Sequence, residues 1–202
     1  FGLAVAQRRT VLTVEEAVVA AEAIGWPIVL KAQRRDRRKR TALGGVALDI
    51  ADADDLRATW ARMHGALGAD AMLPAVVQRF VEQGIDIAVR VRRTARVATV
   101  EVGLGGPSAA FDPWELGVLP LTLPDASTLV AASSVGRALT DPLDRVPVVS
   151  LVHRLAALAD EVEEIHEITA DPVVVTGPAA WITDVHITIG DGRGELPVRH
   201  LG

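Results

Sequence analysis

The chain of 202 residues contains no cysteine and no tyrosine. The first absence excludes disulfides, thiol nucleophiles and zinc–thiolate sites, and the second excludes acid–base chemistry by a phenol. No apolar run approaches the roughly 20 residues of a membrane-spanning helix, and no signal peptide is visible. We therefore expect a protein of the cytoplasm that has no membrane partner.

The net charge and the hydrophobic content further limit the classes of protein that fit the sequence. The formal net charge of −5 argues against nucleic acid as the main partner. Half of the residues are hydrophobic, which is enough for a sizeable core, and the length fits one large domain or two small ones. Because the chain begins at Phe1 rather than at a methionine, we expect it to be a piece of a longer protein.

The first eighty residues combine helix and strand signals. Thr13 followed by Glu16 predicts a capped helix that ends near Gly25. An aspartate at position 52 or 54 is expected to cap a second helix that runs to about residue 67. Apolar runs predict three short strands, over residues 28–32, 44–50 and 75–80.

The rest of the chain begins with two strands whose alternating pattern predicts an antiparallel pair, 85–93 and 96–102. Gly103-Leu-Gly-Gly106 is expected to break the second strand, either as a backbone bend near a ligand or as a simple loop, and residues 111–124 are expected to be irregular. Helices are predicted over 125–139 and 148–164. The glycine-rich stretch after residue 190 is expected to be a tail or linker.

Asp171 and Asp184 flank a predicted β-hairpin, Pro172–Thr183, whose turn signal lies at Gly177-Pro178. If the turn is centred there, the two aspartates face each other, at a Cβ separation of about 4.5–5.5 Å. Like charges at that distance repel, and Mg²⁺ takes one or two carboxylates plus substrate phosphates. The pair predicts a metal site, and the alternative is two strand-end aspartates facing water.

Other polar residues have two readings each. Lys31, in the apolar run Ile28–Ala32, could hold a phosphate, or it could lie on an edge strand and reach outward to water. The basic segment 33–40 could clamp polyphosphate or coenzyme A, or it could be a solvated loop. Asp86 could accept hydrogen bonds from a ribose, or it could belong to the polar face of a strand.

Eight ordered segments together resemble the ATP-grasp domain of NDP-forming acyl-CoA synthetases. That domain is similar to the β chain of succinyl-CoA synthetase and to the synthetase-like domain of bacterial protein lysine acetyltransferases. The resemblance covers Phe1 to about Ile189. The segments that carry it are Val14-Glu-Glu-Ala17, Gly25-Trp-Pro-Ile-Val-Leu-Lys-Ala32, Gly44-Gly-Val-Ala-Leu-Asp-Ile50, Val77-Gln78, Gly103-Leu-Gly-Gly106, Leu119-Pro-Leu121, Glu167-Ile-Thr-Ala-Asp-Pro-Val173 and Thr183-Asp-Val-His186.

The resemblance implies an α+β, ATP-grasp fold of two subdomains with a cleft between them, over 1–82 and 83–190, and a tail over 191–202. It also implies Mg²⁺ with ATP or ADP as the cofactor, held by Asp171 and Asp184. The implied nucleotide-binding residues are Lys31, Gln78, Phe80, Val81 and Asp86. The implied phosphate loop includes Lys39, Arg40, Gly44 and Gly45.

The sequence departs from the family pattern at five positions. Lys39 stands at the usual histidine of a His-Lys-Ser/Thr-Glu loop, whose glutamate is also missing. Ala110 stands at a usual glutamate, Gly117 at a usual arginine, and Thr169 at the acid that supports a phosphohistidine. Phosphoryl transfer depends on charges placed around the moving group. These replacements therefore predict that relay residues are lost while part of the nucleotide pocket remains.

The sequence thus predicts a degenerate, nucleotide-binding or regulatory module of a larger synthetase or acetyltransferase chain, with no catalytic residue of its own. One alternative is an active synthetase component that works with a phosphohistidine partner domain. The other is a structural interaction domain without nucleotide. The resemblance implies a nucleotide, coenzyme A, and CoA-binding, phosphohistidine or acetyltransferase domains as partners.

Overall fold

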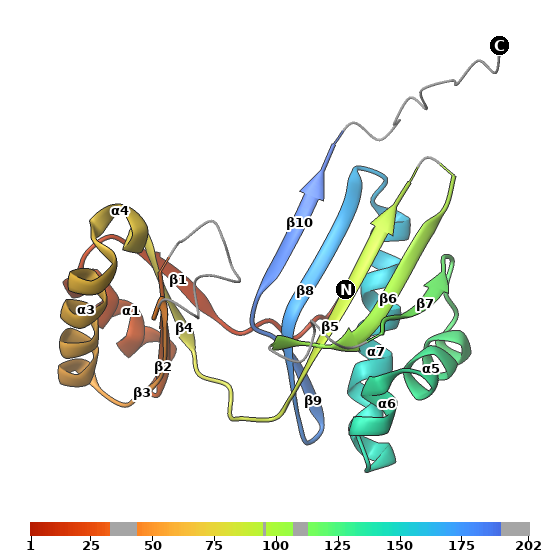
Figure 1. The fold of residues 1–202 in the computed structure, drawn as a ribbon, viewed down its shortest axis with the longest axis horizontal. Helices are drawn as coiled ribbons and strands as arrows, with labels where there is room; N and C mark the ends of the chain where they lie inside the picture. Colours follow the sequence, from red (N-terminus) through yellow and green to blue (C-terminus); the bar gives the residue numbers. More distant parts are fainter. Residues whose placement is uncertain (33–43, 95, 107–112, 191–202) are drawn as a thin grey trace. The chain divides into compact units, whose positions relative to one another are not determined.

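A computed structural model describes residues 1–32, 44–94, 96–106 and 113–190 (Figure 1). Mixed helices and sheets confirm the expected α+β class. The chain divides into two compact units, which are described separately. The first to be described is Ala6–Val81, and the second joins Phe1–Val5 to the residues from Glu82 onward. The basic segment 33–40, Ala110 and the 191–202 tail fall outside the described residues.

The unit Ala6–Val81 has a four-stranded antiparallel sheet of order β1-β4-β2-β3. Its strands are β1 (Arg8–Val11), β2 (Ile28–Lys31), β3 (Val46–Ile50) and β4 (Ala75–Arg79). Its helices are α1 (Val14–Ile24), α3 (Ala53–Leu67) and α4 (Ala69–Met72). The predicted elements of this region are confirmed. The edge-strand reading of Lys31 is wrong, because β2 lies between β4 and β3.

The helix starts follow from the capping residues. The Thr13 hydroxyl accepts from the Glu16 amide at 3.1 Å, as the capping pattern predicts. The Glu16 carboxylate accepts from the Leu12 amide at 2.7 Å, one residue before the cap. Asp52 caps α3, since one of its carboxylate oxygens accepts from the amides of Asp54 and Asp55. These side chains satisfy helix N–H groups that have no partner within the helix.

The second unit has a six-stranded sheet, in which β9 pairs with β8 beside the path β10-β8-β5-β6-β7. Its strands are β5 (Ile85–Arg93), β6 (Ala98–Leu104), β7 (Glu115–Val118), β8 (Ile165–Thr176), β9 (Ala179–Ile182) and β10 (Val185–Ile189). Its helices are α5 (Leu123–Ala132), α6 (Ser134–Ala138) and α7 (Pro142–Glu161).

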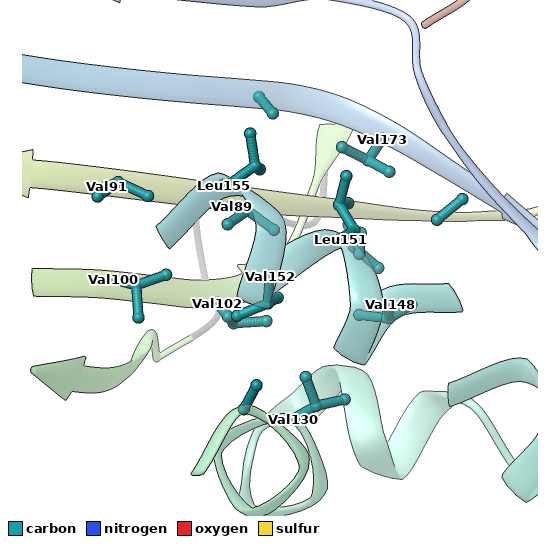
Figure 2. Packing of buried hydrophobic residues seen from close by; sticks show 14 of the residues in the cluster. Val89, Val91, Val100, Val102, Val130, Val148, Leu151, Val152, Leu155 and Val173 are labelled. Atoms are coloured by element: carbon teal, nitrogen blue, oxygen red, sulfur yellow. The ribbon is translucent and has the colours of Figure 1, made fainter. Parts of the chain in front are cut away.

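The hydrophobic core of this unit lies between one face of the sheet and the helices. Figure 2 shows Leu151, Val152 and Leu155 of α7 against Val89 of β5 and Val173 of β8. All five side chains are at most 4% exposed. Burial of this kind is the main stabilising term for the unit, at about 1.5–3 kcal/mol for each large aliphatic side chain. The helices therefore cover the core face of the sheet, and the opposite face carries the polar residues described below.

Four sequence-based boundaries in this unit are wrong. Residues 111–124 include strand β7, and β6 runs through Gly103 to Leu104. The helix predicted over 125–139 is two helices separated at Ser133, whose hydroxyl accepts from the Gly136 amide and starts the second. Helix α7 begins at Pro142, where Asp141 caps it, and it continues through Pro147.

Candidate functional site

The β8–β9 hairpin places Asp171 next to Asp184. The structure pairs Val173 with Ile182 and Val175 with Ala180, as the turn position predicts. Beyond this ladder the Asp171 amide donates to the Asp184 carbonyl at 3.0 Å. Asp184 lies in the short connection between the end of β9 and the start of β10. The backbone thus holds the two aspartates together, whereas their role as metal ligands stays a prediction.

An irregular register explains why the chain bends at this point. On β5, Ile87 pairs with Val173 and Val89 with Ala170, so two residues of β8 lie opposite one of β5. One of those two residues is Asp171. Such a bulge interrupts the ladder and redirects side chains. It therefore separates Asp171 from the regular alternation of the strand.

Asp86 and Gly106 lie next to Asp171. Burial raises the pKa of Asp86, and the nearby Asp171 carboxylate raises that pKa further. The Gly106 amide donates to Asp171 Oδ1 at 3.4 Å, and the Gly105 amide donates to the Asp86 carbonyl at 2.9 Å. A Cβ at Gly106 would lie 2.8 Å from Asp86 Oδ2. The glycine segment after β6 therefore lies directly against both carboxylates, which the sequence pattern left open.

Carboxylate oxygens have the ligand chemistry that a small hard cation requires. Carboxylate oxygen is the ligand that Mg²⁺ prefers, and Mg²⁺ uses one or two carboxylates, the other positions going to water and phosphate. Across residues 1–32, 44–94, 96–106 and 113–190, no three histidine or acidic side chains gather in a metal-binding group. Two carboxylates are the number that Mg²⁺ takes beside phosphate and water, and the role of Asp171 and Asp184 as its ligands stays a prediction.

The open face of the same sheet carries an ion-pair network that the sequence analysis missed. Arg90 Nη1 lies 3.1 Å from Glu101 Oε2, and Arg90 Nε lies 3.6 Å from Glu167 Oε1. Arg92 lies 3.5 and 3.7 Å from the same two carboxylates. The Arg90 guanidinium also stacks on Trp114, 4.5 Å from the ring centroid. The pairing register between neighbouring strands brings these side chains together, so no short sequence motif predicts the cluster.

Thr169 belongs to the edge of this network. It pairs with Arg90 across the β8–β5 ladder, and its hydroxyl donates to Glu167 Oε1 at 3.1 Å. The position at which the family pattern has an acid is therefore occupied by a hydroxyl that is bonded to a neighbouring carboxylate. Gly117, at the position of the usual arginine, lies on β7 with its α-carbon toward the core side chains of Leu121, Leu129 and Val100.

The other predicted nucleotide residues lie in the unit Ala6–Val81. Lys31 is 9% exposed at the end of the interior strand β2, where it pairs with Val76. Gln78 is 2% exposed on β4. Phe80 and Val81 are half-buried beyond the end of β4, and the Phe80 amide donates to the Pro27 carbonyl at 3.2 Å. A buried lysine on an interior strand needs acceptors, and the role of Lys31 in phosphate binding stays a prediction.

The predicted phosphate loop lies mostly outside the described residues, since these exclude Lys39 and Arg40. Gly44 and Gly45 lead into β3, and the Gly45 carbonyl accepts from the Ala32 amide at 2.8 Å. Gly44 has φ 71°, a conformation that favours glycine.

Among the residues that the structure describes, none of the helices has the length and apolar character needed to span a membrane.

Comparisons with known proteins relate this chain to one family and to a group of ligases. A family model described as an ATP-grasp domain matches residues 1–189. The ADP-forming acetate–CoA ligase II of Archaeoglobus fulgidus is 30% identical over 188 residues, which is 90% of this chain and 27% of the ligase. Subunit beta of the Pyrococcus furiosus ligase II is 23% identical, over 94% of this chain and 86% of the subunit.

Solved structures agree on the fold. The dinucleotide-forming acetyl-coenzyme A synthetase 1 of Ca. Korarchaeum cryptofilum, in complex with coenzyme A and Ca-AMPCP, has a TM-score of 0.82 at 24% identity. The match covers 94% of this chain and 87% of the other. Another structure of that enzyme, with coenzyme A and Mg-AMPPCP, has a TM-score of 0.77 at 25% identity, covering 94% and 86%. This chain spans about a quarter of the Archaeoglobus ligase.

Proposed function

Because the chain belongs to the ATP-grasp family and is related to the ADP-forming acetate–CoA ligases, we propose that it is a nucleotide-binding module that has lost the phosphate relay. Nucleotide binding is supported chiefly by the aspartate pair, whose backbones are bonded at 3.0 Å and whose Asp171 carboxylate accepts from Gly106. In this proposal, Asp171 and Asp184 hold Mg²⁺, which neutralises phosphate charge.

Further nucleotide contacts are those that the resemblance implies. Lys31 binds phosphate oxygens, and the chain at Gln78, Phe80 and Val81 contacts the base. Asp86 binds the ribose, whose hydroxyls donate hydrogen bonds to its carboxylate. Gly44 is exposed just before β3 and offers its backbone amide to phosphate oxygens.

Loss of the relay is supported by the residues around Thr169. Its hydroxyl is bonded to Glu167, and the two nearest carboxylates are already paired with Arg90 and Arg92. The carboxylates around Thr169 are therefore already in ion pairs, at the place where a phosphate relay needs a carboxylic acid. Loss of one stabilising group lowers a rate about 10²–10³-fold, and here several positions differ together. We expect no acyl-CoA-dependent ATP synthesis at ordinary enzyme rates, and detecting it with the partner domain added would contradict the loss.

The alternative of an active component is supported by the names of the relatives, which are ligases. That alternative needs a phosphohistidine from a partner. The relatives also indicate how partners are arranged, since one matches this chain over 27% of a long chain and another over 86% of a subunit. We propose that the rest of the synthetase, fused or separate, binds coenzyme A and contacts this module. A fused acetyltransferase domain stays a further possibility from the resemblance alone.

Calorimetric titration with ADP and ATP, with and without Mg²⁺, tests the proposal. We expect binding near 1 mM, about −4 kcal/mol, that strengthens with Mg²⁺. Asp184→Ala should remove the Mg²⁺ dependence, whereas the exposed Asp70→Ala should leave it unchanged. If the wild-type protein gives no heat and no thermal shift at millimolar Mg-nucleotide, the structural alternative is favoured.

A further inference from the structure

Gly106 contacts two carboxylates of the second unit, one from β8 and one from β5. Its amide donates to Asp171 Oδ1 at 3.4 Å, and a Cβ on its α-carbon would lie 2.8 Å from Asp86 Oδ2. The bond to Asp171 is charge-assisted, because its acceptor is a carboxylate. Gly106 is therefore placed to control how the Asp171 carboxylate is oriented.

The backbone around this amide is anchored to β5. Leu104, the last residue of β6, pairs with Ile87. The Gly105 amide then donates to the Asp86 carbonyl at 2.9 Å, and a Cβ at Gly105 would lie 2.6 Å from the Ile87 carbonyl oxygen. The chain thus packs directly on β5 just before Gly106. A donor on an anchored backbone has a fixed direction, whereas a donor on a flexible side chain could follow the carboxylate.

The acceptor is also fixed at its backbone. The Asp171 amide donates to the Asp184 carbonyl at 3.0 Å, and the Thr183 amide donates to the Pro172 carbonyl at 3.2 Å. With its backbone held in this way, Asp171 keeps only the rotation of its side chain. The bond from Gly106 restrains that rotation, so it sets the direction in which the carboxylate points.

A restrained pair of carboxylates does not suit all divalent cations equally. Mg²⁺ demands near-octahedral geometry at about 2.0–2.1 Å and uses one or two carboxylates, whereas Ca²⁺ takes about six to eight oxygens at about 2.3–2.6 Å in a flexible arrangement. Within the described ranges, no group of three acidic or histidine side chains could supply further ligands. Few ligands in a rigid setting favour the smaller ion.

We propose that Gly106 is a positioning residue, whose amide orients the Asp171 carboxylate so that the site prefers Mg²⁺ to Ca²⁺. The inference rests on the proposed function, which supplies Asp171 and Asp184 as the ligands of the ion. Loss of a hydrogen bond to a metal ligand typically lowers metal affinity about 10–100-fold. Loss of the Gly106 bond should therefore be measurable, and it should harm binding with Mg²⁺ more than binding with Ca²⁺.

Calorimetric titration with ADP in excess Mg²⁺ or excess Ca²⁺ tests the preference. For the wild-type chain we expect ADP to bind about tenfold more tightly with Mg²⁺. In Gly106→Ala the added Cβ and the unfavourable φ of +60° should displace the amide, so the preference should fall to about twofold or less. Gly177→Ala is the matched control, because Gly177 has φ +51° with nothing within 4 Å of its Cβ. It should keep the wild-type preference.

Asp171→Glu is the second variant, since it leaves Gly106 and Asp86 unchanged and its longer side chain carries the carboxylate away from the amide. It should lower the preference for Mg²⁺ as well. A merely structural defect would weaken ADP binding with both ions alike, so the ratio of the two affinities separates the two explanations. Equal wild-type affinity with both ions, or a full preference in either variant, would overturn the inference and leave the proposed function intact. If ADP gives no heat with either ion, both fail.

Discussion

The amide of Asp171 donates to the carbonyl of Asp184 at 3.0 Å, so the backbones of the two acidic residues are joined directly. This bond keeps the two residues adjacent. Gly106 adds a third fixed point, because its amide donates to Asp171 Oδ1 and its α-carbon lies against Asp86. Each of these contacts leads to a measurable expectation.

Gly106→Ala should destabilise the second unit by about 1–2 kcal/mol. The residue has φ +60°, a region that side chains other than glycine occupy at a cost of that size, and its Cβ would lie 2.8 Å from Asp86 Oδ2. Urea denaturation followed by tryptophan fluorescence measures the change. Gly65→Ala is the matched control, since Gly65 lies in α3 with nothing within 4 Å of its Cβ. The control should raise stability by about 0.5–1 kcal/mol, and equal effects would contradict the expectation.

Asp86→Asn should remove a pH dependence of stability. Burial and then the Asp171 charge raise the pKa of Asp86 above its ordinary value of 3.8. The folded state therefore holds the proton more tightly, and stability is greatest below 3.8 and falls as the pH rises through the raised pKa. The variant should gain stability over wild type across that interval, as urea midpoints at a series of pH values will show. A difference that does not vary with pH would count against a raised pKa at Asp86.

The contacts of the site that form between residues close together in the sequence were predictable. Strand alternation and the Gly177-Pro178 turn fix the pairing of Val173 with Ile182, and hence the approach of Asp171 to Asp184. Helix starts at Thr13 and Asp52 were predictable for the same reason, because a cap and the amides that it accepts from are at most three residues apart.

Contacts between distant strands were not predictable in this way. Arg90 forms ion pairs with Glu101 and Glu167 only because β5 lies between β6 and β8. No local sequence pattern predicts that strand order. Strand β7 was missed because Glu115-Leu-Gly-Val118 is short and contains a glycine, which weakens the strand signal. The start of α7 is not predictable from the local pattern, because a proline usually marks a helix boundary and Pro147 lies inside this helix.

The Arg90–Glu101 pair should show stronger coupling than an exposed ion pair. Its side chains are 23% and 15% exposed, whereas those of Arg57 and Asp54 on α3 are 56% and 96% exposed. Water screens the second pair more fully, so we expect about 1–2 kcal/mol for the first and under about 0.5 kcal/mol for the second. Double-mutant cycles with Arg→Met and the acid→Ala give both values. Equal couplings would indicate that the network on the open face contributes no more than ordinary surface charges.

Arg154→Gln should loosen the N-terminal segment and, through it, the end of β9. The guanidinium donates to the carbonyls of Phe1 and Gly2, and Ala4, two residues later, accepts from the Ile182 amide. Without the arginine, that last bond opens more often, so the Ile182 amide should exchange several-fold faster while amides in the middle of β5 stay unchanged. Arg137→Gln is the matched control, because Arg137 donates to the carbonyl of Ala132 within the α5–α6 region. Since Ile182 lies two residues before Asp184, Arg154→Gln should also weaken Mg-nucleotide binding more than it weakens binding of the metal-free nucleotide. Unchanged exchange at Ile182 would show that the segment is held by its bridge to β9 alone.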